Sequence, residues 1–510
     1  MSLKSLAYLP IFTLASGALA QTLSNQGLVG YASLPADSVD FLGDTLGGVG
    51  SAAAIFPGTF RKNADGSYSG RLIGGPDRGH NTQGTTDYFG RHQYFDFTLN
   101  PYYGDVANAA IGSLQVSYAG GLEYTDTGAA NGRTTGLDPT GVRAASGSFP
   151  DLPIAGPNNA LCLDQEGLAF LADGSFYASD EYGPYIYHIS ATGVLLGAIQ
   201  PPRAIVPLDA NGDYFFTSGA DPTTGRVANQ GFEGLTISPD QKSLYAMLQS
   251  GTVQDGGSTD FRSKWTRIFH YDISDAANPA LVGEWVVESP ASGSGQGRAV
   301  SELYYLSETR LLALYRDGDG NGNGDPPTPS NGDLKSGLKN IGIVDISEAT
   351  NIANSQYDDP SNPVAPGGVL IDGIVAAPWE EFIDIVDDDQ LAKAGLHNGS
   401  PQLNDIVGKY ESIALASVLE PENPDDYFVF TLADNDFITA NGIQDGVPYA
   451  DPYATGTGFD VPNQMLVFRV TIPGATIPSY INAPVLSPSF AARARARRAA
   501  EGVKRLPNTF

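Results

Sequence analysis

The clearest pattern along the chain is a short strand motif that recurs five times. An aromatic or aliphatic residue is followed by a polar residue, a branched or aromatic residue, and a closing Ser or Thr. The copies lie at residues 95–98, 187–190, 271–274, 344–347 and 468–471. Such alternation is typical of a strand with one buried face. It therefore predicts at least five equivalent strands.

A second motif places an acidic residue at the entrance of an apolar strand, upstream of most copies of the first. Each instance is followed by a turn and by another strand that ends in a polar cluster. The instances are Glu166-Gly167-Leu168, Glu233-Gly234-Leu235, Glu302-Leu303 and Glu411-Ser412-Ile413. The N-terminal copy has Ser51 in place of the Glu. The chain thus repeats one unit of strand, turn, strand, polar loop and strand.

This repeat predicts an all-β protein, a β-propeller with long loops between its blades. Five repeats are visible, and the long stretches 99–160 and 348–408 leave room for six or seven blades. A pair of β-sandwiches is the alternative fold, but it does not explain the recurring Glu positions. Because the inner strands of a propeller start near its axis, we expect the four glutamates of the second motif to converge on a central channel.

Composition agrees with this fold class and excludes some partners. Gly 61 and Pro 35 favour many turns over long helices. The 57 acidic residues outnumber the 28 basic ones, and the net charge of −29 argues against a nucleic-acid partner. No apolar run approaches the length of a membrane span. We expect a monomer that binds neither nucleic acid nor membranes.

Both ends of the chain differ from its body. Residues 1–20 match a secretory signal peptide, with Lys4, an apolar stretch and a small-residue cleavage site; a buried N-terminal strand is the alternative. Residues 486–510 form a basic tail, either a solvated helix that touches the acidic body or a segment trimmed after Arg497-Arg498. Residues 21–485 are then the propeller domain of a secreted, extracellular protein.

Two further residues bear on an exported protein. Cys162 is the only cysteine, so no internal disulfide can form and stability must come from the core, from closure of the fold or from bound ions. Asn398 begins the sequon Asn398-Gly399-Ser400 in a loop-like stretch. We expect a glycan at Asn398.

The order of these short motifs resembles the phytase-like family, also described as having esterase-like activity of phytase. The resemblance extends from about residue 48 to residue 472. It rests on Gly75-Pro76-Asp77-Arg78-Gly79, Asp164-Gln165-Glu166-Gly167-Leu168, Ser179-Asp180-Glu181-Tyr182-Gly183, Asn229-Gln230-Gly231-Phe232-Glu233-Gly234-Leu235, Arg298-Ala299-Val300-Ser301-Glu302 and Lys409-Tyr410-Glu411-Ser412. It implies a secreted or cell-surface hydrolase with a propeller fold, and it leaves the substrate open.

A ring of carboxylates around the channel predicts a cation site. Close carboxylates raise one another's pKa values, so they stay ionised only with cations between them. Ca²⁺ suits such a site because it takes several oxygen ligands in flexible geometry. The expected ligands are Glu166, Glu233, Glu302, Glu411, Asp180 and Asp434. Alternatively, these acids accept backbone N–H bonds from the next blade or pair with arginines.

Arginines and one histidine complete the expected chemistry. Arg78 and Arg316 follow equivalent strands, and a guanidinium matches a phosphate or carboxylate in bidentate fashion. No Gly-x-Ser-x-Gly elbow and no helical histidine pair occur, which disfavours α/β-hydrolase and zinc-protease chemistry. His80 is the histidine best placed for general acid or base work. The expected catalytic residues are Asp77, Arg78, His80, Glu166 and Glu233, and the expected substrate-binding residues are Arg78 and Arg316.

A second cation signal lies in the loop 317–325. Oxygen-bearing side chains alternate with glycines, and Gly322 holds the sixth place as in an EF-hand loop, so Asp317, Asp319 and Asn321 are candidate Ca²⁺ ligands. The loop departs from that motif because Thr328 replaces the twelfth-position Glu and Pro326-Pro327 forbids a following helix. A flexible glycine-rich excursion is the alternative.

Two functions follow from these features. The first is a secreted, calcium-dependent hydrolase that acts on a small anionic phosphate or carboxylate ester at the acidic channel. The second is a non-catalytic propeller, stabilised by calcium, that binds extracellular or cell-wall ligands, and the absence of a recognisable nucleophile favours it. We expect the hydrolase.

Overall fold

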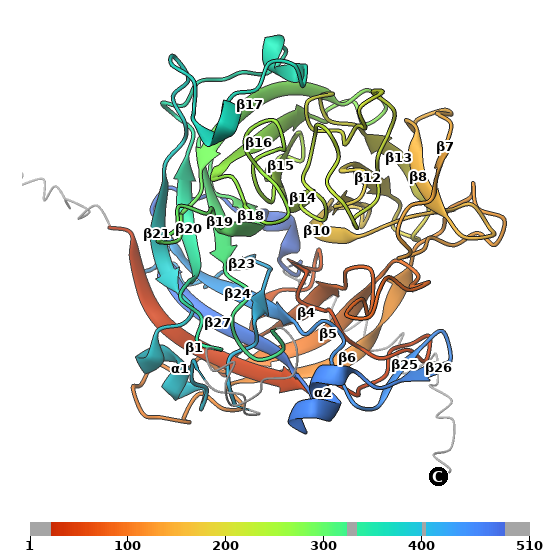
Figure 1. Ribbon diagram of the computed structural model, residues 1–510. Helices are drawn as coiled ribbons and strands as arrows, with labels where there is room; N and C mark the ends of the chain where they lie inside the picture. Colours follow the sequence, from red (N-terminus) through yellow and green to blue (C-terminus); the bar gives the residue numbers. More distant parts are fainter. Residues whose placement is uncertain (1–21, 324–333, 400–403, 485–510) are drawn as a thin grey trace, which may run out of the picture.

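The computed structural model in Figure 1 describes residues 22–323, 334–399 and 404–484. Its regular structure is almost entirely β, in five antiparallel sheets of four or five strands and two small ones. The prediction of an all-β protein is confirmed. The predicted signal peptide and basic tail lie outside the described residues. In the part that is described, no helix is both long enough and apolar enough to span a membrane.

The five large sheets follow one another along the chain. Sheet 1 contains β2 (Ala52–Ile55), β3 (Arg61–Lys62), β4 (Tyr68–Gly75), β5 (Arg91–Leu99) and β6 (Leu114–Glu123). Sheet 2 contains β10 (Gln165–Phe170), β11 (Phe176–Asp180), β12 (Ile186–Ile189) and β13 (Leu195–Ile199). Sheet 3 contains β14 (Phe232–Ile237), β15 (Ser243–Leu248), β16 (Trp265–Asp272) and β17 (Ala280–Glu288). Sheet 4 contains β18 (Ala299–Tyr305), β19 (Arg310–Arg316), β20 (Lys339–Asp345) and β21 (Trp379–Asp384). Sheet 5 contains β22 (Lys409–Tyr410), β23 (Ala414–Ser417), β24 (Asp426–Asp434), β27 (Asn463–Thr471) and β1 (Ser24–Leu34).

The remaining elements are short. The small sheets are β7 (Gly141–Arg143) with β8 (Leu152–Ala155) and β9 (Ala160–Leu161), and β25 (Gly442–Gln444) with β26 (Val447–Tyr449). The helices are α1 (Asp388–Lys393), α2 (Pro452–Thr457) and the 3-10 turns η1 (Gln356–Asp358), η2 (Pro366–Gly368) and η3 (Ser479–Ile481). None of them adds a layer to the sheets.

Both sequence motifs fall on equivalent strands. The first motif lies in or at the end of the third strand of every large sheet, namely β5, β12, β16, β20 and β27. The second motif lies in the first strands β10, β14 and β18, and between β22 and β23 in sheet 5. Among their described residues, the stretches 99–160 and 348–408 contain no further four-stranded sheet. The room that they leave for a sixth or seventh repeat is therefore filled by loops and short elements.

The glycine after the acidic residue lets neighbouring first strands approach closely. A Cβ on Gly167 would lie 2.6 Å from Leu235 Cβ, and one on Gly234 would lie 2.7 Å from Leu303 Cβ. A side chain at either position would force β10 and β14, or β14 and β18, apart. In Figure 1 the first strands β10, β14, β18 and β23 lie towards the middle of the view, and β13, β17, β21 and β6 lie towards its rim.

The hydrophobic core is divided among the interfaces between sheets. Five large clusters of buried side chains each join two sheets: sheets 1 and 2, 2 and 3, 3 and 4, 4 and 5, and 5 and 1. In the last of these, Phe95 and Phe97 of β5 pack with Phe428 and Phe430 of β24. Each sheet therefore buries both faces, which explains why so many strands are apolar on both sides.

Pairing of the two ends of the chain completes sheet 5. Strand β1 runs antiparallel to β27, from Ser24 opposite Thr471 to Leu34 opposite Asn463. Cys162 is buried and free. The described chain is thus joined end to end by strand pairing rather than by a disulfide.

A buried ion triad fastens the 348–378 excursion to sheet 3. Arg267 donates to Asp255 at 2.7 Å and to Glu284 at 2.9 Å, and all three side chains are buried. Asp255 Oδ1 also accepts the Ala365 N–H at 2.9 Å. Burial, only partly offset by Arg267, raises the pKa of Glu284 to about 7.

This raised pKa predicts a pH-dependent stability. Because the folded protein holds the Glu284 proton more tightly than the unfolded chain does, the stabilisation is complete at acidic pH and is lost as the pH rises through about 7. Between pH 5 and pH 8 we expect the free energy of unfolding of the wild type to fall by about 2 kcal/mol more than that of Glu284→Gln. Urea unfolding measures both. Glu288→Gln, at an exposed position on the same strand, should behave like the wild type; an equal fall in all three proteins would contradict this assignment.

Candidate functional site

The first strands carry their polar residues at one end. Glu166 and Glu233 are the second residues of β10 and β14, whereas Phe170 and Ile237 end these strands beside a small apolar cavity. Tyr480 of η3 closes that apolar end, where its hydroxyl donates to the Phe170 carbonyl at 2.8 Å. The polar and charged side chains of the first strands are therefore concentrated where these strands begin.

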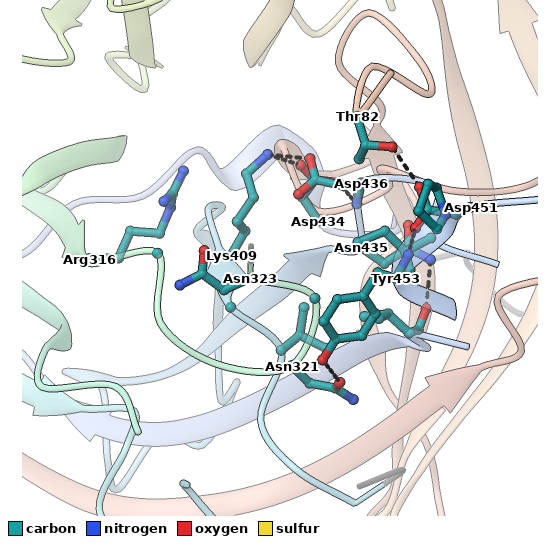
Figure 2. A pocket seen from close by; sticks show the side chains of 17 residues that line it. Thr82, Arg316, Asn321, Asn323, Lys409, Asp434, Asn435, Asp436, Asp451 and Tyr453 are labelled. Atoms are coloured by element: carbon teal, nitrogen blue, oxygen red, sulfur yellow. Dashed lines mark hydrogen bonds and ion pairs between the residues drawn. The ribbon is translucent and has the colours of Figure 1, made fainter. Parts of the chain in front are cut away.

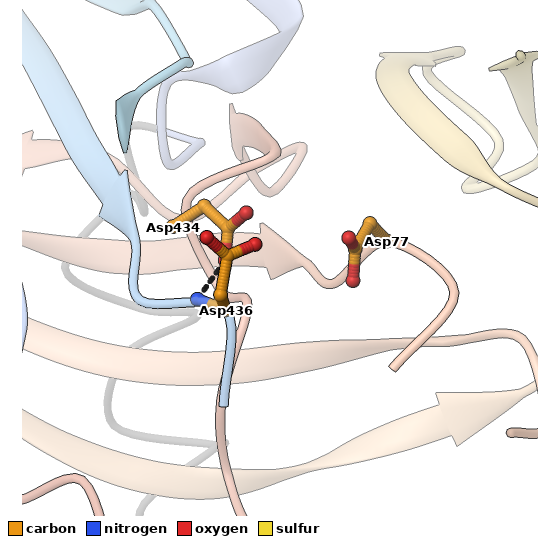
Figure 3. A group of neighbouring side chains, drawn as sticks. All are labelled: Asp77, Asp434 and Asp436. Carbon is orange, nitrogen blue, oxygen red and sulfur yellow. Dashed lines mark hydrogen bonds between the residues drawn. The ribbon is translucent and has the colours of Figure 1, made fainter. Parts of the chain in front are cut away.

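Two groups of three carboxylates meet at this end. Asp77, Asp434 and Asp436 each offer an oxygen within 4.8 Å of the others (Figure 3), and Asp77, Asp164 and Glu166 form a second such group. Asp77 follows β4 and belongs to both groups. The two groups together therefore form one acidic cluster that joins sheets 1, 2 and 5.

Cationic side chains neutralise part of this cluster. Lys409 forms ion pairs with Asp434, with Asp436 at 2.9 Å and with Glu411 at 3.6 Å. Arg316 pairs with Glu411. Arg78 lies 3.1 Å from Asp164 and donates to Ser218 Oγ at 3.0 Å.

Several buried carboxylate oxygens in the cluster nevertheless have no hydrogen-bond donor. Among the described residues these include Oε2 of Glu233 and Oε2 of Glu411, whereas Asp164 has Arg78 as its partner at 3.1 Å. Buried polar atoms are normally satisfied, so such orphans mark a place where a further donor or cation belongs. These candidate ligands are all oxygen atoms and carry negative charge, and such ligands are the ones that Ca²⁺ prefers.

The charges at the site do not balance. Eight carboxylates interact here, namely Asp77, Asp164, Glu166, Glu181, Glu233, Glu411, Asp434 and Asp436, against the five cations Arg78, Arg226, Arg262, Arg316 and Lys409. Burial, reinforced by neighbouring carboxylates, raises the pKa values of Asp77, Glu166 and Glu233 well above the usual range. Burial and Asp164 raise the pKa of Glu181 to about 7. The excess of acids requires either bound protons or a bound cation.

A cavity of about 480 Å³ opens beside the cluster (Figure 2). Arg316, Lys409, Asp434 and Asp436 contribute to its wall, which also includes Thr82, Asn321, Asp451 and Tyr453. Tyr453 belongs to α2 and donates to Asn321 Oδ1 at 2.7 Å. The cavity is large enough for a small organic ester and presents both charged signs to it.

His80 stands behind the wall of this cavity. Its Nε2 lies 2.9 Å from Asp451 Oδ2 and 3.0 Å from Thr82 Oγ1, and its ring stacks on Tyr449. His80 is itself buried and does not line the cavity, whereas Thr82 and Asp451 do. The role of His80 in proton transfer stays a prediction. A proton would have to pass between His80 and the cavity through Thr82 or Asp451.

Two predicted ligands are engaged by the backbone. Oε1 of Glu302 accepts the N–H groups of Leu235 at 3.0 Å and Leu303 at 2.8 Å. Asp180 accepts the N–H groups of Asp164 at 2.8 Å and Gly183 at 2.7 Å. Glu302 thus follows the alternative in which the acid accepts an N–H from the next sheet, whereas Asp180 is bonded within its own sheet. Their roles as metal ligands stay predictions.

The loop after β19 uses its oxygens within the fold. Asp317 accepts Lys339 Nζ at 3.1 Å, Ser336 Oγ at 2.7 Å and the backbone N–H of Gly337 at 2.8 Å. Asp319 Oδ1 accepts Asn323 Nδ2 at 3.1 Å. Residues 324–333, including Asp325 and Thr328, lie outside the described part of the chain. The calcium loop stays a prediction, and its first carboxylate already has a buried lysine as partner.

Asn398 is partly buried and bonded at both ends of its amide. Oδ1 accepts the Ser336 N–H at 2.8 Å, and Nδ2 donates to the Ser336 carbonyl at 3.0 Å. Ser400 of the sequon lies outside the described residues. Glycosylation stays a prediction, and a glycan there would disturb this pair of bonds.

Four residues of the cluster lie in or beside the sequence motifs but were not among the predicted site residues. Asp164, Glu181 and Asp436 lie within two residues of selected acids, and Lys409 lies two residues before Glu411. In extended chain, residues two apart share a face, so this spacing was the available signal for Asp164, Asp436 and Lys409, whereas Glu181 directly follows Asp180. Arg262 lies in a loop between β15 and β16 outside both motifs, and no sequence signal marked it.

Comparison with known proteins shows the family of this chain. A protein of Arthroderma benhamiae, described as an uncharacterized secreted protein, is 36% identical over 467 residues, which cover 83% of this chain and 89% of that one. A chain in a Saccharomyces cerevisiae assembly of Dbp5, Nup159 and Gle1 with IP6 and ADP covers 89% of this chain and 98% of its own, but its 8% identity and TM-score of 0.28 do not establish a common fold. The sequence pattern of the phytase-like family, described as esterase-like activity of phytase, matches residues 99–393. The chain therefore belongs to the phytase-like family.

Proposed function

We propose that this protein is a secreted, calcium-dependent hydrolase of phosphate esters whose active site is the acidic cluster with its adjoining cavity. The observation that carries the proposal is the set of buried carboxylate oxygens without donors beside Arg316 and Lys409. Membership of the phytase-like family supports the reaction class. The secreted relative and the signal-like residues 1–20 support export of a protein that we expect to be monomeric.

The proposed architecture is a five-bladed β-propeller, with each large sheet as one blade. Three features support it: strands run in chain order within sheets 1 to 4, each sheet packs on two neighbours, and β1 completes the last sheet. In such a fold the starts of the first strands surround the axis. The acidic cluster would then be the mouth of the central channel.

Arg316 and Lys409 are the side chains that we expect to hold the phosphate group. Both line the cavity and both have carboxylate partners that a phosphate could replace. A guanidinium offers a fixed fork of donors, and an ammonium adds a point charge. As negative charge develops on the phosphoryl oxygens during hydrolysis, the same two groups would stabilise it.

A calcium ion would be held by oxygens of Asp77, Asp164 and Glu166, or by those of Asp77, Asp434 and Asp436. Bound calcium would supply Lewis-acid polarisation of the ester.

Asp436 lines the cavity, and its pKa is raised by burial and by Asp434. In its ionised form Asp436 would accept a proton of the attacking water as the water oxygen bonds to phosphorus and the ester P–O bond breaks, and the departing alkoxide would take a proton from solvent water.

Arg316→Gln tests this function. We expect phosphate release from a monophosphate ester to fall by about 100-fold, because the main stabilising donor is lost. Arg310→Gln is the matched control, since Arg310 begins the same strand and donates to the Pro473 carbonyl away from the cavity. Arg316→Lys separates loss of charge from loss of the fork. Full activity in folded Arg316→Gln would contradict the proposal.

A non-catalytic binding protein is the second candidate. The observation that favours it is that Arg316 and Lys409 are already paired with carboxylates, as in a purely structural ion network. Retained binding of a phosphate-bearing ligand without hydrolysis of phosphate or carboxylate esters would support this candidate.

A further inference from the structure

A buried glutamine joins the two segments that carry the second group of carboxylates. Gln165 is the first residue of β10 and lies between Asp164 and Glu166, two members of that group. Its Nε2 donates to the Pro76 carbonyl at 2.8 Å. Pro76 directly precedes Asp77, the third member. The Gln165 side chain therefore ties the segment after β4 to the start of β10, where the three carboxylates meet.

The orientation of the Gln165 amide follows from its partners. Besides the Pro76 carbonyl, Nε2 binds the Arg91 carbonyl, to which it donates at 2.7 Å. A carbonyl can only accept, so the NH₂ group must face these two oxygens and Oε1 must face away from them. Oε1 accepts the hydroxyl of Tyr124, which directly follows β6, at 2.7 Å. Gln165 and Tyr124 are both buried, so bulk water does not compete for these bonds.

Behind Tyr124 the hydrogen bonds continue through His92 and Tyr94 of β5. Nδ1 of His92 lies 3.2 Å from the Tyr124 hydroxyl, and Nε2 lies 3.0 Å from the Tyr94 hydroxyl. His92 is buried with its ring against those of Phe170 and Phe176. Tyr94, His92 and Tyr124 thus form a tyrosine–histidine chain that leads from β5 to the amide at the start of β10.

Each proton of the tyrosine–histidine chain can be assigned. The Tyr124 hydroxyl donates its one proton to Gln165, so towards His92 its oxygen can only accept. Nδ1 of His92 therefore carries a hydrogen. Burial lowers the pKa of His92 to about 3, so at neutral pH the ring is uncharged and Nε2 accepts the Tyr94 proton. All donors point the same way, from Tyr94 to the Pro76 carbonyl, and bonds in such a series strengthen one another.

We propose that Gln165 is a positioning residue that fixes Asp77 in the metal-binding arrangement, and that the tyrosine–histidine chain fixes Gln165. The inference rests on the proposed function, in which Asp77 is a calcium ligand. Calcium affinity depends on the charge and the rigidity of the ligand set, and the groups that hydrogen-bond behind the ligands determine that rigidity. Gln165 and the tyrosine–histidine chain therefore act on the cation through Asp77, without touching the cation or the substrate.

The test is calorimetric titration of calcium into purified, calcium-free protein and its variants. Gln165→Leu keeps the approximate size of the side chain and removes its hydrogen bonds, so it should weaken calcium affinity by at least about tenfold. Tyr124→Phe removes one hydroxyl and should weaken calcium affinity by about fivefold. Tyr427→Phe is the matched control. Tyr427 is also buried, but its hydroxyl donates to the Ala475 carbonyl at 2.9 Å, so calcium affinity should not change.

His92 supplies a readout that a loss of stability alone would not move. His92→Leu interrupts the tyrosine–histidine chain and should weaken calcium affinity about as much as Tyr124→Phe does. His92→Asn places an amide N–H near the position of Nδ1 and should restore most of that affinity. In the wild type at neutral pH, nitrogen NMR should find a hydrogen on Nδ1 of His92 and none on Nε2.

The outcomes separate this inference from the proposed function. Unchanged calcium affinity in folded Gln165→Leu and Tyr124→Phe would overturn the inference and leave the proposed function standing. An equal loss in Tyr427→Phe, or a hydrogen on Nε2 of His92, would overturn it as well. If Gln165→Leu fails to fold, Tyr124→Phe decides, because it removes a single hydroxyl. A wild type that binds no calcium would overturn both the inference and the calcium dependence of the proposed function.

Discussion

Lys409→Met is expected to lower the free energy of unfolding by about 3 kcal/mol in calcium-free solution, among the largest effects of any single substitution in this protein. Lys409 is the shared partner of Asp434, Asp436 and Glu411. Removing it takes the ion-pair partner from Asp434 and Asp436 and leaves Glu411 with Arg316 alone, whereas methionine keeps the packing of the stem. Urea unfolding at neutral pH with chelator measures the change.

The control for this variant is Lys62→Met. Lys62 pairs with Glu420 at 2.7 Å at an exposed site, so its loss should cost at most about 1 kcal/mol. Saturating calcium should restore part of the stability of Lys409→Met, because a cation can replace the missing ammonium. If Lys409→Met were as stable as Lys62→Met without calcium, the acidic cluster would not carry the uncompensated charge that its composition indicates.

Asp77→Asn is expected to weaken calcium binding by about 100-fold and to reduce hydrolysis by a similar factor. Asp77 is the one residue common to both groups of carboxylates, so its neutralisation removes a ligand charge from either arrangement. Asparagine keeps the size of the side chain and can still accept the Gly79 N–H at 3.1 Å. Calorimetric titration with calcium and a phosphate-release assay measure the two losses.

A second Asp→Asn substitution, at the surface, tests whether the effect depends on the position of Asp77 or only on the loss of one negative charge. Asp65→Asn changes an exposed turn residue that accepts the Ser67 hydroxyl, and it should leave calcium affinity and turnover unchanged. Unchanged calcium affinity in Asp77→Asn would place the ion elsewhere. Loss of calcium binding with full activity would show that the ion has a structural role and takes no part in the reaction.

Much of the fold could be predicted because the sequence repeats. Glu166 and Glu233 mark the first strands and the motif 95–98 marks a third strand, since a recurring alternation of side-chain types is typical of strands and strands that pack closely must carry glycine. The absence of a further four-stranded sheet among the described residues of 99–160 and 348–408 could not be predicted, because the length of a loop does not reveal what it forms. These stretches bind back through contacts such as that of Asp255 with Ala365.

The candidate site could be predicted only in part. The convergence of Glu166, Glu233 and Glu411 followed from the repeat, whereas Glu302 in the same motif position turns its carboxylate to the backbone of β14. The position of a residue in its strand determines where its Cα lies, but the nearest hydrogen-bond donor determines where its carboxylate points. Loop residues such as Arg262 carry no periodic signal, so their approach to the cluster emerges only from the folded structure.

The most direct test of calcium-dependent hydrolysis at the acidic cluster measures the phosphate that purified protein of known metal content releases from a monophosphate ester. The release is measured before chelation, after chelation and after calcium is returned. We expect bound calcium, activity that chelation removes, and activity that calcium restores in the wild type but not in Asp77→Asn. Equal phosphate release with and without calcium, or bound calcium with no hydrolysis under any condition, would contradict it.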